Sequence, residues 1–448
     1  MDVEEFARKA LAAGLHEDAV KDRLARCIRG FKPGAEPGYI DELAEAVIAE
    51  VKNTTGLSGD LFTFREAGVS MGEFGVGSRG TGDFYAHRQI ARIIGSTGAT
   101  VGVDEMDDAG AVPIPALSAS HDLQVVCTVD GMHSRLSDFP FLAGFHVTRA
   151  TMRDVYVMGA RPLLLFSDIH VADGGDVAKI FEYTAGVCAV GESMGVPLVA
   201  GSTLRIGGDM VLGSRMTGCV GTVGIASHLT ARREARPGDV ILMTEGAGGG
   251  TIATAALYSG YPEVVEQTIN LHFLQACEAL LASPALQSIH AMTDVTNGGL
   301  RGDAHELAST AGCRVVVEEE KVHGLVQEEV GSLLERLSID PLGVSLDALL
   351  ITAPPDAAHS IMEVIRSAGV RVQEIGSVEE GSPGAFLLTG KGLRDFTPRF
   401  RESAYTPVKK VVDRGGRDFE EMKAAVEAAA LAAMQKKERM VARLRKRE

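Results

Sequence analysis

The first part of the chain carries apolar residues at helical spacing. In two stretches they lie three or four positions apart: Val3, Phe6, Ala7, Ala10 and Leu11, then Leu43, Ala46 and Val47. This spacing predicts helices with one apolar face. Proline and glycine within residues 32–38 interrupt the pattern, so the helices are separate. We expect a helical extension over residues 1–66 that packs on the rest of the chain or offers a surface to a partner.

The pattern then changes to short β-branched runs between helical stretches. It predicts strands at 122–129, 197–200 and 218–223 and helices at 147–158 and 176–194. A new unit starts near Arg236, with predicted strands at 240–244, 314–317 and 347–352. We therefore expect one α/β domain over residues 67–228, a second over 229–400, and a helical tail over 401–448.

Composition limits the class of protein. With 448 residues, of which 45% are hydrophobic and 23% charged, the chain can bury the cores of two domains. Its formal net charge of -16 argues against nucleic acid or an anionic membrane as the main partner. No stretch approaches the roughly 20 apolar residues that span a bilayer, the start does not resemble a signal peptide, and the six cysteines form no Cys-x-x-Cys pair. We expect a cytoplasmic protein.

One apolar run ends on a carboxylate. Residues 124–130, Gln-Val-Val-Cys-Thr-Val-Asp, predict a strand whose end fixes Asp130, and Met106-Asp-Asp-Ala109 lies upstream of it. Oxygen ligands held in this way suit Mg²⁺ that bridges to the phosphates of a nucleotide. Asp also ends strands because it favours turns, so the run alone leaves both interpretations open.

Three later segments extend this pattern: residues 149–162, 198–203 and 291–300. Their order and spacing resemble the aminoimidazole-ribonucleotide synthetase superfamily, which includes thiamine-monophosphate kinase, selenophosphate synthetase, a carbamoyl-dehydrating hydrogenase-maturation protein and formylglycinamidine-ribonucleotide amidotransferase. The resemblance covers about residues 67 to 395. Within the superfamily the chain is most similar to the selenophosphate-synthetase-related proteins, because of Gly75-Val-Gly-Ser-Arg-Gly-Thr-Gly-Asp-Phe84 followed by His87.

This resemblance implies an α+β fold of two domains. The N-terminal domain would be a mixed α/β domain whose sheet forms a β-barrel in a homodimer, and the C-terminal domain would be α/β. The helices at both ends of the chain would be additions to this fold. The resemblance also implies an ATP-binding enzyme whose active site lies at the dimer interface, with Mg²⁺ held between aspartates and phosphates. ATP, a small-molecule substrate and a second copy of the chain are the expected partners.

The resemblance places the metal ligands on four aspartates: Asp107, Asp108, Asp130 and Asp294. Asp107 and Asp108 match the superfamily's Asp-Asp-Ala-Ala-Val turn, with one residue inserted at Gly110. Two adjacent carboxylates on a tight turn cannot easily reach one ion, so we expect Asp108 to bind it and Asp107 to orient the turn. Asp294 is also a candidate catalytic residue near the substrate; the alternative is that it caps the helix that follows.

One helix is expected to face the nucleotide. Asp154 matches an Asp that the relatives carry just before Met-Gly-Ala-x-Pro, whereas Ala150 and Arg153 stand where the relatives have Asn and Ser. Arg153, or Arg149 one turn earlier, would neutralise a phosphate or an acidic group of the substrate. A surface salt bridge is the alternative role for this arginine. We take Arg153 as a candidate catalytic residue and Asp154 as a nucleotide-binding residue.

Two turns are also expected at the nucleotide. The predicted lid over ATP contains Gly75, Gly77, Arg79, Gly80 and His87. Its Gly-x-Gly-x-x-Gly spacing fits a dinucleotide fingerprint as well, but no strand precedes it. The second turn, with Gly201 and Thr203, occupies the place of a Gly-Gly-Asp-Thr motif in which Ser202 replaces the Asp.

A further glycine run, residues 245–251, follows a predicted strand and opens a predicted helix. Its backbone N–H groups could bind an anion, although the run lacks the Gly-Lys-Ser/Thr ending of a P-loop. Close packing of backbone between the domains is the alternative explanation for these glycines.

Together these features predict a Mg²⁺-dependent ATP-binding enzyme that transfers a phosphoryl group to a small metabolite or uses ATP to activate one. Residues 68–88 contain neither the Cys nor the Lys of selenophosphate synthetases, and the chain ends without the C-terminal Cys of the carbamoyl-dehydrating relative. Both of those activities are therefore disfavoured. The alternative is a catalytically silent ATP-binding regulatory or partner protein, which the altered positions 150 and 153, Ser202 and the extra helices motivate.

Overall fold

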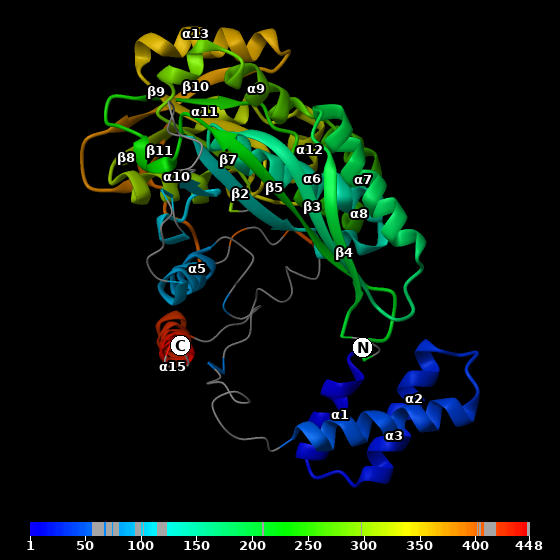
Figure 1. Ribbon diagram of the computed structural model, residues 1–448. Coiled ribbons are helices and arrows are strands. Elements are labelled where there is room, and N and C mark those ends of the chain that lie inside the picture. Colours follow the sequence, from blue (N-terminus) through cyan, green and yellow to red (C-terminus); the bar gives the residue numbers. More distant parts are fainter. Residues whose placement is uncertain are drawn as a thin grey trace.

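The computed structural model describes residues 1–55, 67–68, 74, 80–94, 100–101, 103–113, 123–207, 210–296, 298–400, 402, 405–406 and 418–445. Two β-sheets with their helices form the main body, and a group of N-terminal helices lies at one end of it (Figure 1). Among these residues no helix combines the length and the apolar character needed to cross a bilayer.

The N-terminal helices form a unit with its own core. They are α1 (Val3–Ala12), α2 (Glu17–Phe31) and α3 (Pro37–Thr54). Their apolar faces meet in a buried cluster that includes Leu24 and Ile28 of α2 and extends to Leu212 of the main body. The N-terminal ammonium donates to the carbonyl of Leu212 at 2.7 Å, and Lys32 pairs with Asp173. The unit therefore packs partly on itself and partly on the chain's own main body.

The first sheet has five strands in the order β1-β2-β5-β3-β4. Their bounds are β1 (Gly110–Pro113), β2 (Gln124–Gly131), β3 (Arg161–Val171), β4 (Leu198–Arg205) and β5 (Met216–Ala226). All neighbours are antiparallel except β3 and β4. Helices α6 (Pro140–Val157) and α7 (Ala178–Met194) cover one face. The sequence predicted β2, β4, β5 and both helices but not β1 or β3.

Strand β3 follows α6 almost at once because of a tight turn at Gly159. This glycine has a φ of +74°, and an added Cβ would lie 2.3 Å from the carbonyl oxygen of His228. Only glycine fits both the left-handed backbone and this close approach. The turn returns the chain along the sheet directly after the helix.

The second sheet has seven strands in the order β12-β11-β8-β10-β6-β9-β7. Their bounds are β6 (Val240–Thr244), β7 (Ala291–Val295), β8 (Arg314–Glu318), β9 (Ala348–Ala353), β10 (Val372–Glu379), β11 (Gly384–Thr389) and β12 (Gly392–Asp395). The helices of this domain are α8 (Gly250–Ser259), α9 (His272–Leu281), α10 (Gly299–Ala311), α11 (Glu319–His323), α12 (Glu328–Arg336) and α13 (Pro355–Ser367).

Short 3-10 helices connect these elements. They are η1 (Val103–Glu105), η2 (Ser134–Asp138), η3 (Arg232–Glu234), η4 (Pro262–Thr268), η5 (Pro284–Ser288) and η6 (Pro341–Gly343). Helix α5 (Thr81–Ile94) packs beside the long C-terminal helix α15 (Phe419–Arg445), with an ion pair between Arg92 and Glu427 at 3.1 Å (Figure 1). The predicted helical tail is therefore present, and it packs on the chain itself.

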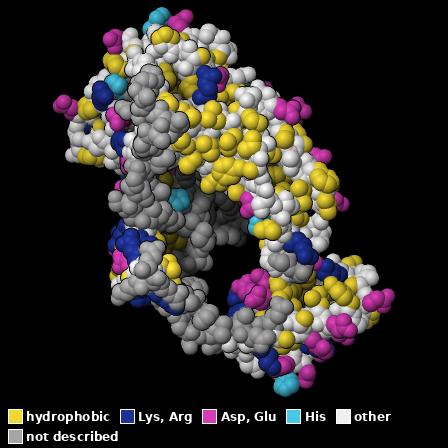
Figure 2. All heavy atoms as spheres, in the orientation of Figure 1, with side chains coloured by type: hydrophobic (Ala, Val, Ile, Leu, Met, Phe, Trp, Pro, Cys, Tyr) yellow, Lys and Arg dark blue, Asp and Glu magenta, His cyan; other side chains and the backbone are white. Residues whose placement is uncertain are grey.

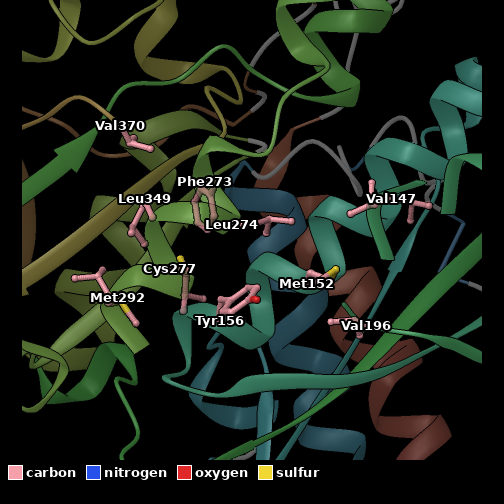
Figure 3. Packing of buried hydrophobic residues seen from close by; sticks show 14 of the residues in the cluster. Val147, Met152, Tyr156, Val196, Phe273, Leu274, Cys277, Met292, Leu349 and Val370 are labelled. Carbon is pink, nitrogen blue, oxygen red and sulfur yellow. The ribbon is translucent and has the colours of Figure 1, made fainter. Parts of the chain in front are cut away.

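The two sheet domains share a continuous apolar core. Figure 3 shows Met152 and Tyr156 of α6 in one cluster with Phe273 and Cys277 of α9 and Met292 of β7. All five are at most 2% exposed. Burial of such side chains stabilises the contact by roughly 1.5–3 kcal/mol each. This packing fixes α6 of the first domain against the second domain.

Candidate active site

One pocket lies where α6 meets the second domain. Asp130 at the end of β2, Asp154 on α6 and Asp294 on β7 all line it. These carboxylates come from three segments that are far apart in the sequence and from both sheet domains. Among the described residues, however, no three His, Cys, Asp or Glu side chains already form a group that could hold a metal ion by themselves.

Strand alternation brings Asp130 to this pocket. In β2, Val126 is buried and Thr128 and Asp130 are half-buried, whereas Cys127 and Val129 between them are exposed. Successive side chains of a strand point to opposite faces. Thr128 shares the inner face with Asp130 and donates from Oγ1 to Oδ2 of Asp154 at 3.1 Å. The inner face of β2 is thus tied to the carboxylate of α6.

The carboxylates crowd one another. Burial raises the pKa of Asp154 well above its usual range, and the charges of Asp130, Asp294 and Asp108 raise it further. Arg153 opposes this rise. Several negative charges close together in a partly buried place favour a cation among them.

Arg153 connects the two domains inside the pocket. Its Nε donates to Oδ2 of Asp294 at 2.9 Å, and its guanidinium also pairs with Asp347. Arg149 pairs with Asp347 from one turn earlier and donates from Nη1 to the carbonyl of Thr268 at 2.5 Å. Arg153, Asp294 and Asp347 are all less than 10% exposed. The surface salt bridge considered for this arginine is therefore wrong, because the ion pair is buried at the pocket.

The acidic turn lies near the pocket but is not part of its lining. Asp108 pairs with Arg232 at 2.5 Å and accepts a hydrogen bond from Oγ1 of Thr293 at 2.7 Å. Asp107 accepts from the backbone N–H groups of Asp108 and Arg232, both at 2.8 Å. Burial raises the pKa of Asp107, and the charge of Arg232 lowers it. The turn therefore attaches the first domain to the start of the second, and neither carboxylate lines the pocket.

The other predicted nucleotide-binding residues are spread over the chain. Gly201 and Thr203 line a separate hollow beside α7, with Tyr183. His87 is exposed on α5. Gly80 is buried, and an added Cβ there would lie 2.3 Å from the carbonyl oxygen of Phe400. Gly75, Gly77 and Arg79 lie outside the described residues.

Two histidines and one aspartate of the site were not predicted from the sequence. His133 and His146 line the pocket, and Asp347 pairs with both arginines of α6. A signal for His146 was available: it precedes Asp154 by eight residues, so both lie on one face of a helix. Nothing in the sequence marks Asp347. Its φ of +58° is unusual for a residue other than glycine, and its buried ion pairs hold it there.

Family models match both sheet domains. The model described as AIR synthase related protein, N-terminal domain, matches residues 106–225, and the corresponding C-terminal domain model matches residues 236–388. The uncharacterized protein MJ1416 of Methanocaldococcus jannaschii is 47% identical over 100% of this chain and 99% of its own length. The chain belongs to the AIR synthase-related family.

Other relatives carry functional names. A selenide, water dikinase of Myxococcus xanthus is 27% identical over 66% of this chain and 90% of its own length. A carbamoyl dehydratase HypE of Rhodobacter capsulatus is 33% identical over 46% of this chain, and the chain spans only 60% of that protein.

Solved structures share the fold. The structure of HypE from E. coli superposes with a TM-score of 0.55, at 20% identity, over 72% of this chain and 98% of that one. HypE in complex with ATP superposes with a TM-score of 0.52, at 22% identity, over 61% and 85%. The expected two-domain α+β fold with added terminal helices is thus confirmed.

Proposed function

We propose that this protein is a Mg²⁺-dependent ATP-binding enzyme that transfers a phosphoryl group from ATP to a small metabolite or uses ATP to activate one. The observation that carries the proposal is the gathering of Asp130, Asp154 and Asp294 around one pocket that also contains Arg153. The names of the dikinase relative and of the ATP complex of HypE support a nucleotide as the shared ligand.

The carboxylates of the pocket suit Mg²⁺. Asp130, Asp154 and Asp294 would hold it, and the crowding of their negative charges is the feature that fits a divalent cation. In such sites Mg²⁺ uses one or two carboxylates together with water and phosphate oxygens, so a preformed cage of three ligands is not required. When bound, the ion neutralises charge on the phosphates.

Arg153 has a positioning role in this proposal as well as an electrostatic one. Asp294 and Asp347 hold its guanidinium at the boundary between the domains, so its position is fixed before a substrate binds. Phosphoryl transfer depends mainly on such prearranged charges. Asp108 and Asp107 instead keep the first domain attached through Arg232. Contact of Gly201, Thr203 and His87 with the nucleotide stays a prediction.

We also propose that the protein is a homodimer. The face of the first sheet that points away from α6 exposes apolar side chains, among them Val129, Phe166 and Leu204. Figure 2 shows a broad group of hydrophobic side chains over this sheet. Apolar patches of this kind on a folded protein mark an interface, and two copies can cover the same face of each other around a two-fold axis. Such a pairing would bring the two sheets together as the expected barrel.

Measurement of ATP turnover tests the enzymatic proposal. We expect Mg²⁺-dependent release of phosphate or ADP in the presence of the correct metabolite and its loss with EDTA. Asp130→Asn should abolish turnover, whereas Asp356→Asn, on the exposed first turn of α13, should not. Equal turnover by Asp130→Asn and by the unmodified protein would reject the role of this pocket.

A silent ATP-binding protein is the second candidate. The observation that favours it is Arg153, whose guanidinium is already engaged by Asp294 and Asp347. Ser202, which stands where the resemblance expects a carboxylate, points the same way. Tight ATP binding without turnover, across a broad set of small metabolites, would reject the enzyme and favour this candidate.

A further inference from the structure

The glycine run that follows β6 opens onto the same pocket. Helix α8 begins at Gly250 after the N-cap residue Gly249, and no side chain caps it. Gly249 and Gly250 both line the pocket. The first N–H groups of a helix have no carbonyl partner within it, and the helix dipole favours negative charge beside them. A helix start alone does not define a site, but a second group faces it.

That group is the imidazole of His146. The residue is 5% exposed and lines the pocket, and its Nδ1 has no hydrogen-bond partner within the described chain. A Cβ placed on Gly249 would lie 4.0 Å from this Nδ1 and 3.8 Å from Oδ2 of Asp347. The absent side chain of Gly249 therefore leaves room for a ligand atom about 4.0 Å from the unpaired nitrogen. Asp347 is already balanced there by Arg149 and Arg153.

The hydrogen bonds around His146 define its tautomer. Oγ1 of Thr268 donates its only proton to the carbonyl of Val265 at 2.6 Å, so it can only accept from Nε2 of His146 at 3.3 Å. Burial and the positive charge of Arg149 lower the pKa of His146 well below its usual range. The ring is then neutral with its proton on Nε2. Nδ1 carries a lone pair and needs a donor from the ligand.

An anion that lies at the start of α8 and also contacts Nδ1 of His146 would face a lone pair, so it binds best if it carries a proton to donate. We propose that this end of the pocket is a binding subsite for a protonated phosphate group, in which the first N–H groups of α8 take the negative oxygens and Nδ1 of His146 accepts the P–O–H. Sulfate has the same shape but no proton at neutral pH. The subsite would select phosphate over sulfate.

The subsite adds a second phosphate position to the proposed function, and the identity of its ligand as a substrate rests on that function. His146 and Asp154 are eight residues apart on α6, which is about 12 Å along the helix axis. The carboxylate end of the pocket would hold the nucleotide phosphates, and the α8 end would hold a phosphate group of the second substrate or free phosphate. The carboxylate end of the pocket is negative and the α8 end favours anions, so each end would bind a different ligand.

Titration calorimetry of the full-length protein with inorganic phosphate and with sulfate tests the subsite. ATP and Mg²⁺ are left out and ionic strength is kept equal, so that the carboxylate end repels both anions. We expect phosphate to bind at least tenfold more tightly than sulfate. Equal affinities, or no binding of phosphate, would overturn the proposal. A parallel titration with glycerol phosphate distinguishes the two possible ligands. Binding of glycerol phosphate would indicate a phosphate ester as the ligand, and binding of inorganic phosphate alone would indicate free phosphate.

Three variants make the test specific. A Cβ at Gly250 would meet His133 and His146 at 3.5 Å, an ordinary contact, so Gly250→Ala should fold normally while its methyl group narrows the pocket at the start of α8. We expect it to weaken phosphate binding tenfold or more without lowering the melting temperature. His146→Gln, which can keep a donor to Thr268 but has no acceptor at Nδ1, should lose the preference over sulfate. His146→Asn, with an amide oxygen near the place of Nδ1, should keep it.

These outcomes are separate from those of ATP turnover. Unchanged phosphate binding in Gly250→Ala would overturn the subsite even if Asp130→Asn abolished turnover. If the protein binds phosphate as expected but does not turn over ATP, the subsite is supported and only the enzymatic proposal is rejected.

Discussion

Arg153 on helix α6 donates a hydrogen bond from Nε to Oδ2 of Asp294 on strand β7, across 2.9 Å, and so joins the two sheet domains at the pocket. The bond spans 141 residues of sequence. Asp347 accepts from the same guanidinium. One side chain therefore supplies both a cation of the pocket and one of the contacts between the domains.

Removal of this cation should destabilise the protein. Arg153→Met leaves Asp294, which is 1% exposed, without its buried partner. Loss of one member of a buried ion pair costs roughly 3–5 kcal/mol. We expect a lower urea midpoint in unfolding followed by circular dichroism.

The matched control for Arg153→Met is Arg366→Met. Arg366 pairs with Glu363 in an ion pair whose side chains are 46% and 60% exposed, and such a pair contributes about 0.2–1 kcal/mol. The double variant Arg153→Met with Asp294→Leu should recover part of the lost stability, because position 294 then carries no unpaired buried charge and Asp347 keeps its pair with Arg149. No recovery would contradict the desolvation argument.

Asp108 and Asp130 should separate stability from function. Asp108→Asn weakens the buried contact with Arg232 and the hydrogen bond from Thr293, so it should lower the melting temperature. Asp130 is half-buried at the end of a strand, so Asp130→Asn should leave the melting temperature nearly unchanged while ATP turnover is lost. Thermal unfolding and a turnover assay on both variants check this pair. The reverse pattern would assign the metal to the acidic turn instead of the pocket.

The apolar face of the first sheet should control the oligomeric state. Leu204 on β4 is 57% exposed. It pairs in register with His170 of β3, and His170 lies on the same face of β3 as Phe166 because the two are four residues apart in a strand. Leu204 therefore lies on the apolar face. Leu204→Asp introduces a charge that a dimer interface would have to desolvate. We expect light scattering to give twice the mass of one chain for the unmodified protein and a lower mass for the variant.

The matched control for the oligomeric state is Leu393→Asp. Leu393 is 45% exposed on β12 of the second sheet, away from the proposed interface. It should leave the mass at that of the dimer. A monomeric unmodified protein, or dissociation by both variants, would exclude the proposed interface.

The N-terminal unit should respond separately to a core mutation. Leu24 on α2 is fully buried within the helical cluster. Leu24→Ala should destabilise that cluster by about 2–5 kcal/mol through lost burial and a residual cavity. Hydrogen exchange read by mass spectrometry should show faster exchange in residues 1–54. Because the cluster contacts the main body mainly near Leu212, exchange in the second sheet should not change. Faster exchange throughout would show that the two parts unfold together.

Local patterns predicted much of the fold. The helical period of residues 3–11 and 43–47 gives α1 and part of α3, and the run from Gln124 to Asp130 gives β2. The three segments after Asp130 were enough to identify the family and its two-domain fold. Helix α6 begins seven residues before its predicted start at 147. Strand β3 was missed because its first six residues, Arg-Pro-Leu-Leu-Leu-Phe, include no β-branched side chain.

The residues of the candidate site were also predicted only in part. The resemblance to the family pointed to Asp130, Asp154 and Asp294, each through a motif within a short segment, and all three line one pocket. It did not indicate that Asp108 pairs with Arg232, or that Asp347 holds Arg149 and Arg153 from a distant loop. The glycine run at 249–250 was visible, but its neighbour His146 was not connected with it.

The sequence determined the periodic elements of this protein, because backbone geometry fixes which residues of a helix or strand share a face. Only the tertiary structure decided which charges meet. Such pairs join positions more than 100 residues apart, and their energies depend on the burial that results when the two domains pack. That packing places His146 opposite the open end of α8 and Asp130 beside Asp154.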